Sequence, residues 1–208
     1  MKITAILGSP RLKGNSAALA EEFLQEAERL GAEVERFRLQ KMKYSGCTGC
    51  NTCKTKTECC VLKDDLSLAL ESIRETETVL IAAPVYAFDI PAQLKALMDR
   101  WYSFFKPFYY RGKDVSRLAP GKKIIFVIAQ RAPEGTFMDV VQRYDFMFKL
   151  FGFQPTYLIR GCNLGDDPEA AARRPDLMEL ARKTARQMMA GEPSTAEIPS
   201  YIVRGFQV

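Results

Sequence analysis

The sequence predicts an α/β protein built on a doubly wound parallel sheet of five strands, in the order 2-1-3-4-5, with helices on both faces. Five strand-like segments alternate with five amphipathic helical segments over about 190 residues. The first, third and fourth strand-like segments are apolar throughout, which is typical of parallel strands that are buried on both faces. Right-handed connections between such strands give a doubly wound sheet.

The first strand and helix enclose a polar loop. Residues 2 to 7 (KITAIL) form the first predicted strand, and the stretch GSPRLKGNS follows it. We expect Asn15 or Ser16 to cap a helix that stops at Gly31. Such a loop directs backbone N–H groups and the positive end of a helix dipole at one point, and four side chains add donors: Ser9, Arg11, Asn15 and Ser16. A phosphate fits this loop, but an ordinary strand-to-helix turn has the same pattern, because neither the P-loop lysine signature nor GxGxxG is present.

The remaining elements repeat this alternation. We expect strands at residues 33–39, 79–83, 124–129 and 154–160, and helices from near residue 63, at 92–105, at 137–150 and at 168–189. In a sheet of this order, ligands bind beyond the carboxyl ends of the strands, at the switch point between strands 1 and 3. The loops at those two ends are residues 8–16 and 84–90, and both have ligand-binding character.

A cysteine-rich loop at residues 44–62 follows the second strand. Its thiols have the spacing C-x2-C-x2-C-x5-C, formed by Cys47, Cys50, Cys53 and Cys59, and Cys60 is an alternative fourth member. Three thiolates at intervals of three resemble the compact binding segments of iron-sulfur clusters. Structural zinc, a redox disulfide and reduced structural thiols remain alternatives.

Composition limits the classes of function. The 208 residues are 47% hydrophobic, which is enough for one sizeable core. The net charge of +5 is spread along the chain, so we expect no nucleic-acid partner. No segment approaches the roughly 20 apolar residues of a membrane span, and we expect a soluble, cytoplasmic protein without a membrane partner. Because the chain has no histidine, histidine acid-base catalysis and imidazole metal sites are excluded.

Three motifs together resemble a known family. GSPRLKGNS, GCTGCNTC and APVYAFDIPAQLKALMDRWY are similar to segments of the flavodoxin-like NAD(P)H-dependent FMN reductases, and within them the iron-sulfur flavoproteins. The resemblance implies that Ser9, Arg11, Asn15 and Ser16 hold the FMN phosphate. It also implies that Pro84, Val85, Tyr86 and Phe88 line the isoalloxazine, and that the cysteines bind a 4Fe-4S cluster. The family has a glycine soon after strand 4, where this chain has Gln130, Arg131 and Ala132.

The expected function is that of an FMN-dependent oxidoreductase. Electrons from NAD(P)H or a donor protein would pass through FMN, and through the cluster, to a quinone or another acceptor such as a ferredoxin-like protein. One alternative is an electron-transfer or redox-sensing flavoprotein without turnover of its own. Another is a plain FMN reductase with zinc or free thiols in the cysteine loop.

The chain divides into a domain and a tail. We expect residues 1–190 to form the FMN-binding domain. Residues 191–208 carry Ile198, Tyr201, Ile202, Val203 and Phe206, which are too apolar to remain exposed. We predict that this tail packs at a subunit interface, although docking on its own subunit explains the pattern equally well. The family resemblance implies a homodimer or homotetramer.

Overall fold

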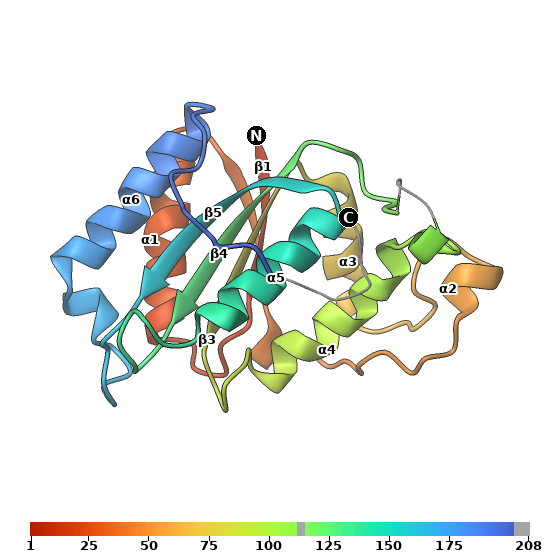
Figure 1. Cartoon of the computed structure of the whole chain (residues 1–208), viewed down its shortest axis with the longest axis horizontal. Helices are drawn as coiled ribbons and strands as arrows, with labels where there is room; N and C mark the ends of the chain where they lie inside the picture. The colour runs from red at the N-terminus through yellow and green to blue at the C-terminus, as the bar shows by residue number, and fades with distance from the viewer. Residues whose placement is uncertain (112–114, 202–208) are drawn as a thin grey trace.

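The computed structural model describes residues 1–111 and 115–201, and it confirms the predicted sheet (Figure 1). All neighbouring strands are parallel, in the order β2-β1-β3-β4-β5. The strands are β1 (Lys2–Leu7), β2 (Glu33–Arg38), β3 (Thr78–Pro84), β4 (Lys122–Ala129) and β5 (Phe153–Gly161). The α-helices are α1 (Asn15–Arg29), α2 (Thr52–Thr55), α3 (Leu66–Glu75), α4 (Ala92–Arg100), α5 (Met138–Leu150) and α6 (Pro175–Met189). Residues Ile202, Val203 and Phe206 of the predicted tail lie outside the described residues.

The helices cover both faces of the sheet. Helices α1 and α6 pack on one face, and α3, α4 and α5 pack on the other (Figure 1). Each face encloses its own apolar core, and the side chains of β1, β3 and β4 alternate between the two cores. This alternation explains why these three strands are apolar throughout, since neither of their faces meets water.

Close packing fixes the end of β1 against α4. A Cβ atom on Gly8 would lie 2.9 Å from the Cβ of Leu94 and 3.2 Å from the carbonyl oxygen of Ala82. Only glycine allows this approach, so the loop that follows β1 is held directly beside the loop that follows β3. These are the two loops that meet at the predicted switch point.

Two helix starts differ from the sequence expectations. The last helix begins at Pro175 rather than near residue 168, and a short 3₁₀ turn at Ala171–Arg173 precedes it. A proline disfavours the helical conformation for the residue before it, and Arg174 is indeed extended. The first helix is capped by Gly14, without a side-chain bond from Asn15 or Ser16.

The aromatic-rich stretch after α4 is largely core. Trp101 and Phe104 are buried, and Trp101 stacks on Phe153 with a centroid distance of 5.7 Å. In contrast, Phe108 and Tyr110 are 65% and 61% exposed. The described part of the tail contacts its own subunit: Ile198 packs on the core, and Tyr201 lies 6.1 Å from the ring of Phe146.

Candidate functional site

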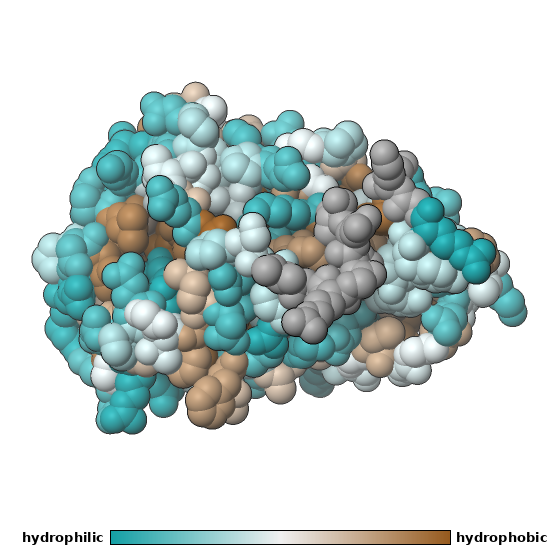
Figure 2. Space-filling model, viewed as in Figure 1, coloured by the Kyte–Doolittle hydropathy of each residue, from teal (hydrophilic) through white to brown (hydrophobic). Residues whose placement is uncertain are grey.

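A cleft lies at the carboxyl ends of β1, β3 and β4. It is lined by Ser9, Arg11, Gly14, Asn15, Ser16, Pro84, Val85, Tyr86, Ala129, Gln130, Arg131, Gly165, Asp166, Asp167 and Pro168. Seven of the eight predicted cofactor residues therefore line one cleft, as the topology requires. The eighth, Phe88, stands 76% exposed at the tip of the loop between β3 and α4 and packs edge-on against Phe137 at 5.7 Å. Figure 2 shows this tip as apolar surface at the lower edge of the molecule.

The loop before α1 carries an unused donor. Ser16 is 1% exposed, and its Oγ has no hydrogen-bond partner within the described part of the chain. The Oγ of nearby Ser9 accepts the backbone N–H of Arg11 at 3.1 Å. The first N–H groups of a helix are not used inside the helix, and they point in the same direction as its positive dipole end. The start of α1 thus offers a hydroxyl and backbone donors to an anion.

Asn15 has a different role from the one its sequence position indicated. Its Nδ2 donates to the carbonyl oxygen of Asp167 at 2.8 Å, and its Oδ1 accepts the N–H of Ala171 at 2.8 Å. Both ends of the amide are therefore engaged with the loop that follows β5. Asn15 fixes this loop at the rim of the cleft, so its side chain positions the wall of the cleft.

The loop between β3 and α4 is a tight turn. The backbone groups of Tyr86 and Asp89 exchange hydrogen bonds of 2.8 and 3.0 Å. The two central residues, Ala87 and Phe88, have φ angles of +45° and +69°. Left-handed backbone in non-glycine residues costs roughly 1 kcal/mol or more each and is frequent at ligand sites.

Asp89 holds this strained turn on the body of the protein. Its carboxylate accepts hydrogen bonds from Arg143 Nη1 at 2.8 Å, from the Tyr144 hydroxyl at 3.0 Å and from the backbone N–H of Ile90 at 2.7 Å. The pKa of Tyr144 is raised, because its hydroxyl is buried and lies beside the Asp89 carboxylate. The tyrosine therefore remains a donor at neutral and alkaline pH.

The side chain of Gln130 shapes the loop after β4, where this chain has no glycine at positions 130–132. Gln130 is 3% exposed, and its Nε2 lies within 3.2 Å of three carbonyl oxygens, those of Ala132, Pro133 and Thr136. Arg160 on β5 donates to the Gln130 Oε1 at 3.1 Å. The side chain of Gln130 thus fixes the turn. Sequence reasoning missed the loop at residues 165–168, although a polar GDDP segment directly after a strand was its signal.

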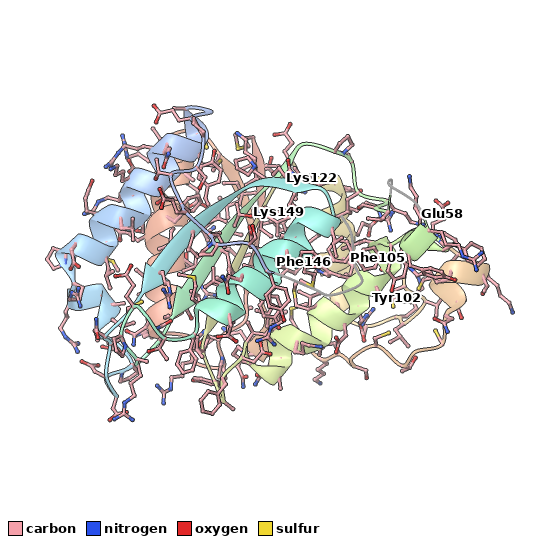
Figure 3. The ribbon with its side chains drawn as sticks, viewed as in Figure 1. Glu58, Tyr102, Phe105, Lys122, Phe146 and Lys149 are labelled. Atoms are coloured by element: carbon pink, nitrogen blue, oxygen red, sulfur yellow. The ribbon has the colours of Figure 1, made fainter. Side chains whose placement is uncertain are left out.

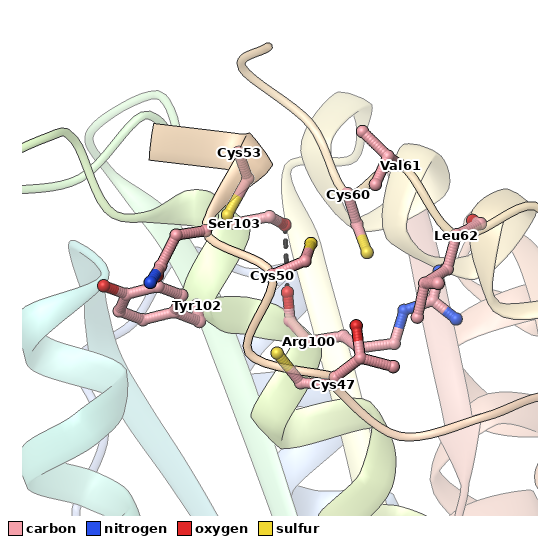
Figure 4. A pocket seen from close by; sticks show the side chains of 11 residues that line it. Cys47, Cys50, Cys53, Cys60, Val61, Leu62, Arg100, Tyr102 and Ser103 are labelled. Carbon is pink, nitrogen blue, oxygen red and sulfur yellow. Dashed lines mark hydrogen bonds between the residues drawn. The ribbon is translucent and has the colours of Figure 1, made fainter. Parts of the chain in front are cut away.

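The cysteine-rich loop at residues 44–62, called the cysteine segment from here on, forms a second site at the far end of α4. Figure 3 places Tyr102 and Phe105 beside the part of this segment that carries Glu58. A small cavity there is lined by Cys47, Cys50, Cys53 and Cys60, and Arg100 and Tyr102 are among its other walls (Figure 4). Cys59 does not line this cavity; it borders a neighbouring groove with Lys63 and Arg74.

The four thiols surround a space without converging on one point. Across residues 1–111 and 115–201, no three His, Cys, Asp or Glu side chains are close enough together to hold a single metal ion. Hydrogen bonds from Thr52 lower the pKa of the Cys50 thiol, whereas burial raises the pKa of Cys53. The cavity shown is small, about 20 Å³, and Cys47 and Cys50 on its outer side are exposed.

Four described cations hold the cysteine segment on the domain, and one of them, Arg74, donates to the carbonyl oxygen of Glu58 at 3.0 Å. Lys54 donates to the carbonyl oxygens of Tyr102 and Phe105, and Arg117 donates to those of Cys53 and Ser103 at 2.8 and 2.9 Å. Arg100 pairs with Asp64 at 2.5 Å. The segment has little regular structure of its own, so these bonds define its shape.

Comparisons with known proteins agree with this arrangement. The family model Flavodoxin_2, described as a flavodoxin-like fold, matches residues 1–185. An iron-sulfur flavoprotein of Archaeoglobus fulgidus is 41% identical over 100 residues, which are 48% of this chain and 45% of that protein. An FMN-dependent NADH:quinone oxidoreductase of Sinorhizobium medicae is 38% identical over 111 residues, 50% of this chain and 53% of that protein. The chain thus spans about half the length of these curated relatives.

Solved structures share the fold. A FMN-dependent NADH-azoreductase from Bacillus anthracis, in complex with FMN, superimposes with a TM-score of 0.68 at 18% identity, covering 91% of this chain and all of that chain. An NAD(P)H:quinone oxidoreductase from Methanothermobacter marburgensis has the same TM-score of 0.68 at 15% identity, covering 90% of this chain and 96% of that one. In the described part of the chain, no helix combines the length and the apolar character that crossing a membrane requires.

Proposed function

This chain belongs to the Flavodoxin_2 family of flavodoxin-like folds, and on this premise we propose that it is an FMN-dependent oxidoreductase. It would take electrons from NAD(P)H or from a donor protein and pass them to a quinone or another acceptor. The observation that carries the proposal is one cleft lined by both loops: it contains the buried Ser16 hydroxyl, which has no partner among the described residues, and Pro84, Val85 and Tyr86 after β3.

The residues of the cleft fit FMN. Ser9, Arg11 and Ser16 would hold the phosphate. The backbone N–H groups of Asn15 and Ser16, at the start of α1, would add donors. A Cβ on Gly14 would lie 3.2 Å from the Cβ of Arg11 and 3.3 Å from the Oγ of Ser9, so glycine leaves this cradle open. Pro84, Val85 and Tyr86 would border the ring. The NADH and FMN in the names of the similar quinone reductase and azoreductase support the choice of cofactors.

The protein's task in this reaction is positioning. FMN, when bound, accepts a hydride and releases electrons singly or in pairs. With a quinone, the balance is NAD(P)H plus a proton plus quinone giving NAD(P)⁺ plus quinol. No side chain has to act as a general base, which agrees with the lack of histidine. The Asp89 carboxylate is engaged with Arg143 and Tyr144 and therefore orients the turn that would border the ring.

We further propose that the cysteine segment binds a 4Fe-4S cluster. The names of the iron-sulfur flavoproteins support this, and so does the placement of four thiols around one cavity. Zinc would need all of its sulfurs about 2.3 Å from one point, whereas in a cluster the thiolates bind different iron atoms. The fourth ligand we propose is Cys60, because Cys60 and not Cys59 lines the cavity. About 20 Å³ holds one water molecule, so binding would move the exposed thiols outward.

Turnover separates the enzyme from its alternatives. We expect anaerobically purified protein to oxidise NADH or NADPH with a quinone acceptor well above the rate of an equal concentration of free FMN. A rate equal to that background would contradict the enzyme and leave an electron-transfer or redox-sensing flavoprotein. Turnover by protein whose cysteine segment contains zinc and no iron would indicate the other alternative, a plain FMN reductase.

The proposed assembly is a homodimer or homotetramer. Exposed Phe108 and Tyr110 near the cysteine segment, and the apolar tail from residue 191, support it. Light scattering on the full chain and on a chain ending at Ala190 tests whether the tail contributes. An unchanged mass would leave the tail docked on its own subunit, where Ile198 and Tyr201 already lie.

A further inference from the structure

A buried arginine lies against the cysteine cavity. Arg100 is the last residue of α4, and its side chain is 0% exposed. Its Nη1 pairs with Asp64 Oδ1 at 2.5 Å and lies 3.4 Å from the carbonyl oxygen of Ser45, and its Nη2 donates to that of Leu62 at 3.1 Å. Ser45 and Leu62 stand on either side of the cysteine segment, so one guanidinium joins its two ends.

One nitrogen of the guanidinium has no acceptor among the described residues. The Nε of Arg100 is buried and has no hydrogen-bond partner among the described residues. A guanidinium carries its five N–H donors in a fixed plane, so Nε cannot turn toward the acceptors that Nη1 and Nη2 already use. Leaving a charged donor unpaired in the interior is energetically costly. Such a group points to an acceptor that binds later.

The cavity that Arg100 lines is where that acceptor would lie. Figure 4 draws the Arg100 side chain below the thiols of Cys50 and Cys60 and above that of Cys47, and all four residues line the cavity. Thiolate and sulfide sulfurs accept hydrogen bonds and carry negative charge. The other described cations that bond to the segment are engaged elsewhere, since Lys54, Arg74 and Arg117 donate to backbone carbonyls.

We propose that Arg100 donates its Nε–H to a sulfur of the bound cluster and thereby raises the cluster's reduction potential. This inference rests on the proposed 4Fe-4S cluster. A hydrogen bond to sulfur stabilises the more negative, reduced cluster more than the oxidised one. Arg100 is thus a positioning and tuning residue for electron transfer, in addition to joining the ends of the segment.

The test compares two variants that weaken the same ion pair, one by changing Arg100 and the other by changing its partner Asp64. Arg100→Lys keeps the positive charge but removes the guanidinium and with it the Nε–H donor. Asp64→Asn keeps that donor and removes the negative charge of the carboxylate. We expect Arg100→Lys to shift the reduction equilibrium of the cluster about tenfold toward oxidation, a potential lower by about 59 mV for one electron. Asp64→Asn should leave the potential unchanged or raise it. Lys95→Gln, on the exposed side of α4, is the matched control and should change nothing.

The potentials are read by redox titration monitored by electron paramagnetic resonance, with the FMN potential as an internal reference. Equal potentials in native protein and Arg100→Lys, or a lower potential in both pair variants, would overturn the inference and leave Arg100 as a structural clamp. Native protein that contains FMN but neither iron nor sulfide would instead overturn the proposed cluster.

A second measurement covers the case in which Arg100→Lys fails to fold or to load. Native protein with ¹⁵N-labelled arginine should show a nitrogen coupling in the electron-nuclear double resonance spectrum of the reduced cluster. The same coupling should persist in Arg117→Lys and in Arg74→Lys, which remove the two other described arginines that bond to the segment. Absence of the coupling, or its loss in either of these variants, would contradict the role of Arg100.

Discussion

The hydroxyl of Tyr144, on α5, donates a 3.0 Å hydrogen bond to the carboxylate of Asp89 at the base of the turn after β3. A buried helix residue thus holds in place a turn whose two central residues, Ala87 and Phe88, have left-handed backbone. The strain of the turn is maintained by this contact and by Arg143. The rigidity of the proposed ring-binding loop therefore originates in α5.

Removing the hydroxyl with Tyr144→Phe should destabilise the protein by about 1.5 kcal/mol, because Asp89 loses a buried charge-assisted partner. FMN affinity should fall several-fold, because the turn becomes looser. Tyr157→Phe is the matched control, since it also removes one hydroxyl bond, to the carbonyl oxygen of Glu192, away from the cleft. Chemical denaturation and flavin fluorescence titration measure both quantities. An equal loss of FMN affinity in the two variants would contradict the proposed role of the turn.

Ser16→Ala should weaken FMN binding about tenfold, the effect of one hydrogen bond to a charged group. The stability of the FMN-free protein should hold or rise, because the hydroxyl has no hydrogen-bond partner among residues 1–111 and 115–201. Thr156→Val removes another buried hydroxyl, on β5 and outside the cleft, that also has no partner in the described part of the chain. It should leave the dissociation constant unchanged. If Ser16→Ala bound FMN as tightly as the native protein, the proposed phosphate site at the start of α1 would be contradicted.

Cys60→Ala should lose most of its iron, whereas Cys59→Ala should keep it, since only Cys60 lines the cavity with the other three thiols. The two changes are chemically identical and adjacent, so each serves as the control for the other. Iron and sulfide analysis of anaerobically reconstituted proteins reads the result. If only Cys59→Ala lost its iron, the fourth cluster ligand would be Cys59, as the cysteine spacing in the sequence predicted.

The ion pairs of Glu26 with Arg29 on α1 and with Arg186 on α6 make stability depend on acid pH. Hydrogen bonds from Arg29 and Arg186 lower the pKa of Glu26 to about 2. Because the folded pKa lies below the unfolded value of about 4.3, the contribution of Glu26 is complete above that pH and is lost as the pH falls toward 2. Glu26→Gln should be less stable than native protein at pH 7, with a smaller difference near pH 2. Denaturation at several pH values measures this, and a difference that grows in acid would contradict it.

Most of the fold was predictable because burial on both faces leaves a strong signal in β1, β3 and β4. The start of the last helix was not, because Pro175 and its effect on Arg174 outweighed the apolar pattern that begins earlier. The cleft was predictable from the position of two loops at a switch point. The role of Asn15 was not, because its partners Asp167 and Ala171 lie more than 150 residues away. The Arg100–Asp64 pair likewise joins elements that no local pattern connects.

The most direct test of the account is the content of FMN, iron and acid-labile sulfide in protein purified without oxygen. The account predicts about four iron and four sulfide per FMN, the composition of one 4Fe-4S cluster in a flavoprotein. FMN without iron and sulfide would contradict the electron path through the cysteine segment. Protein that binds no FMN would contradict the function proposed for the cleft.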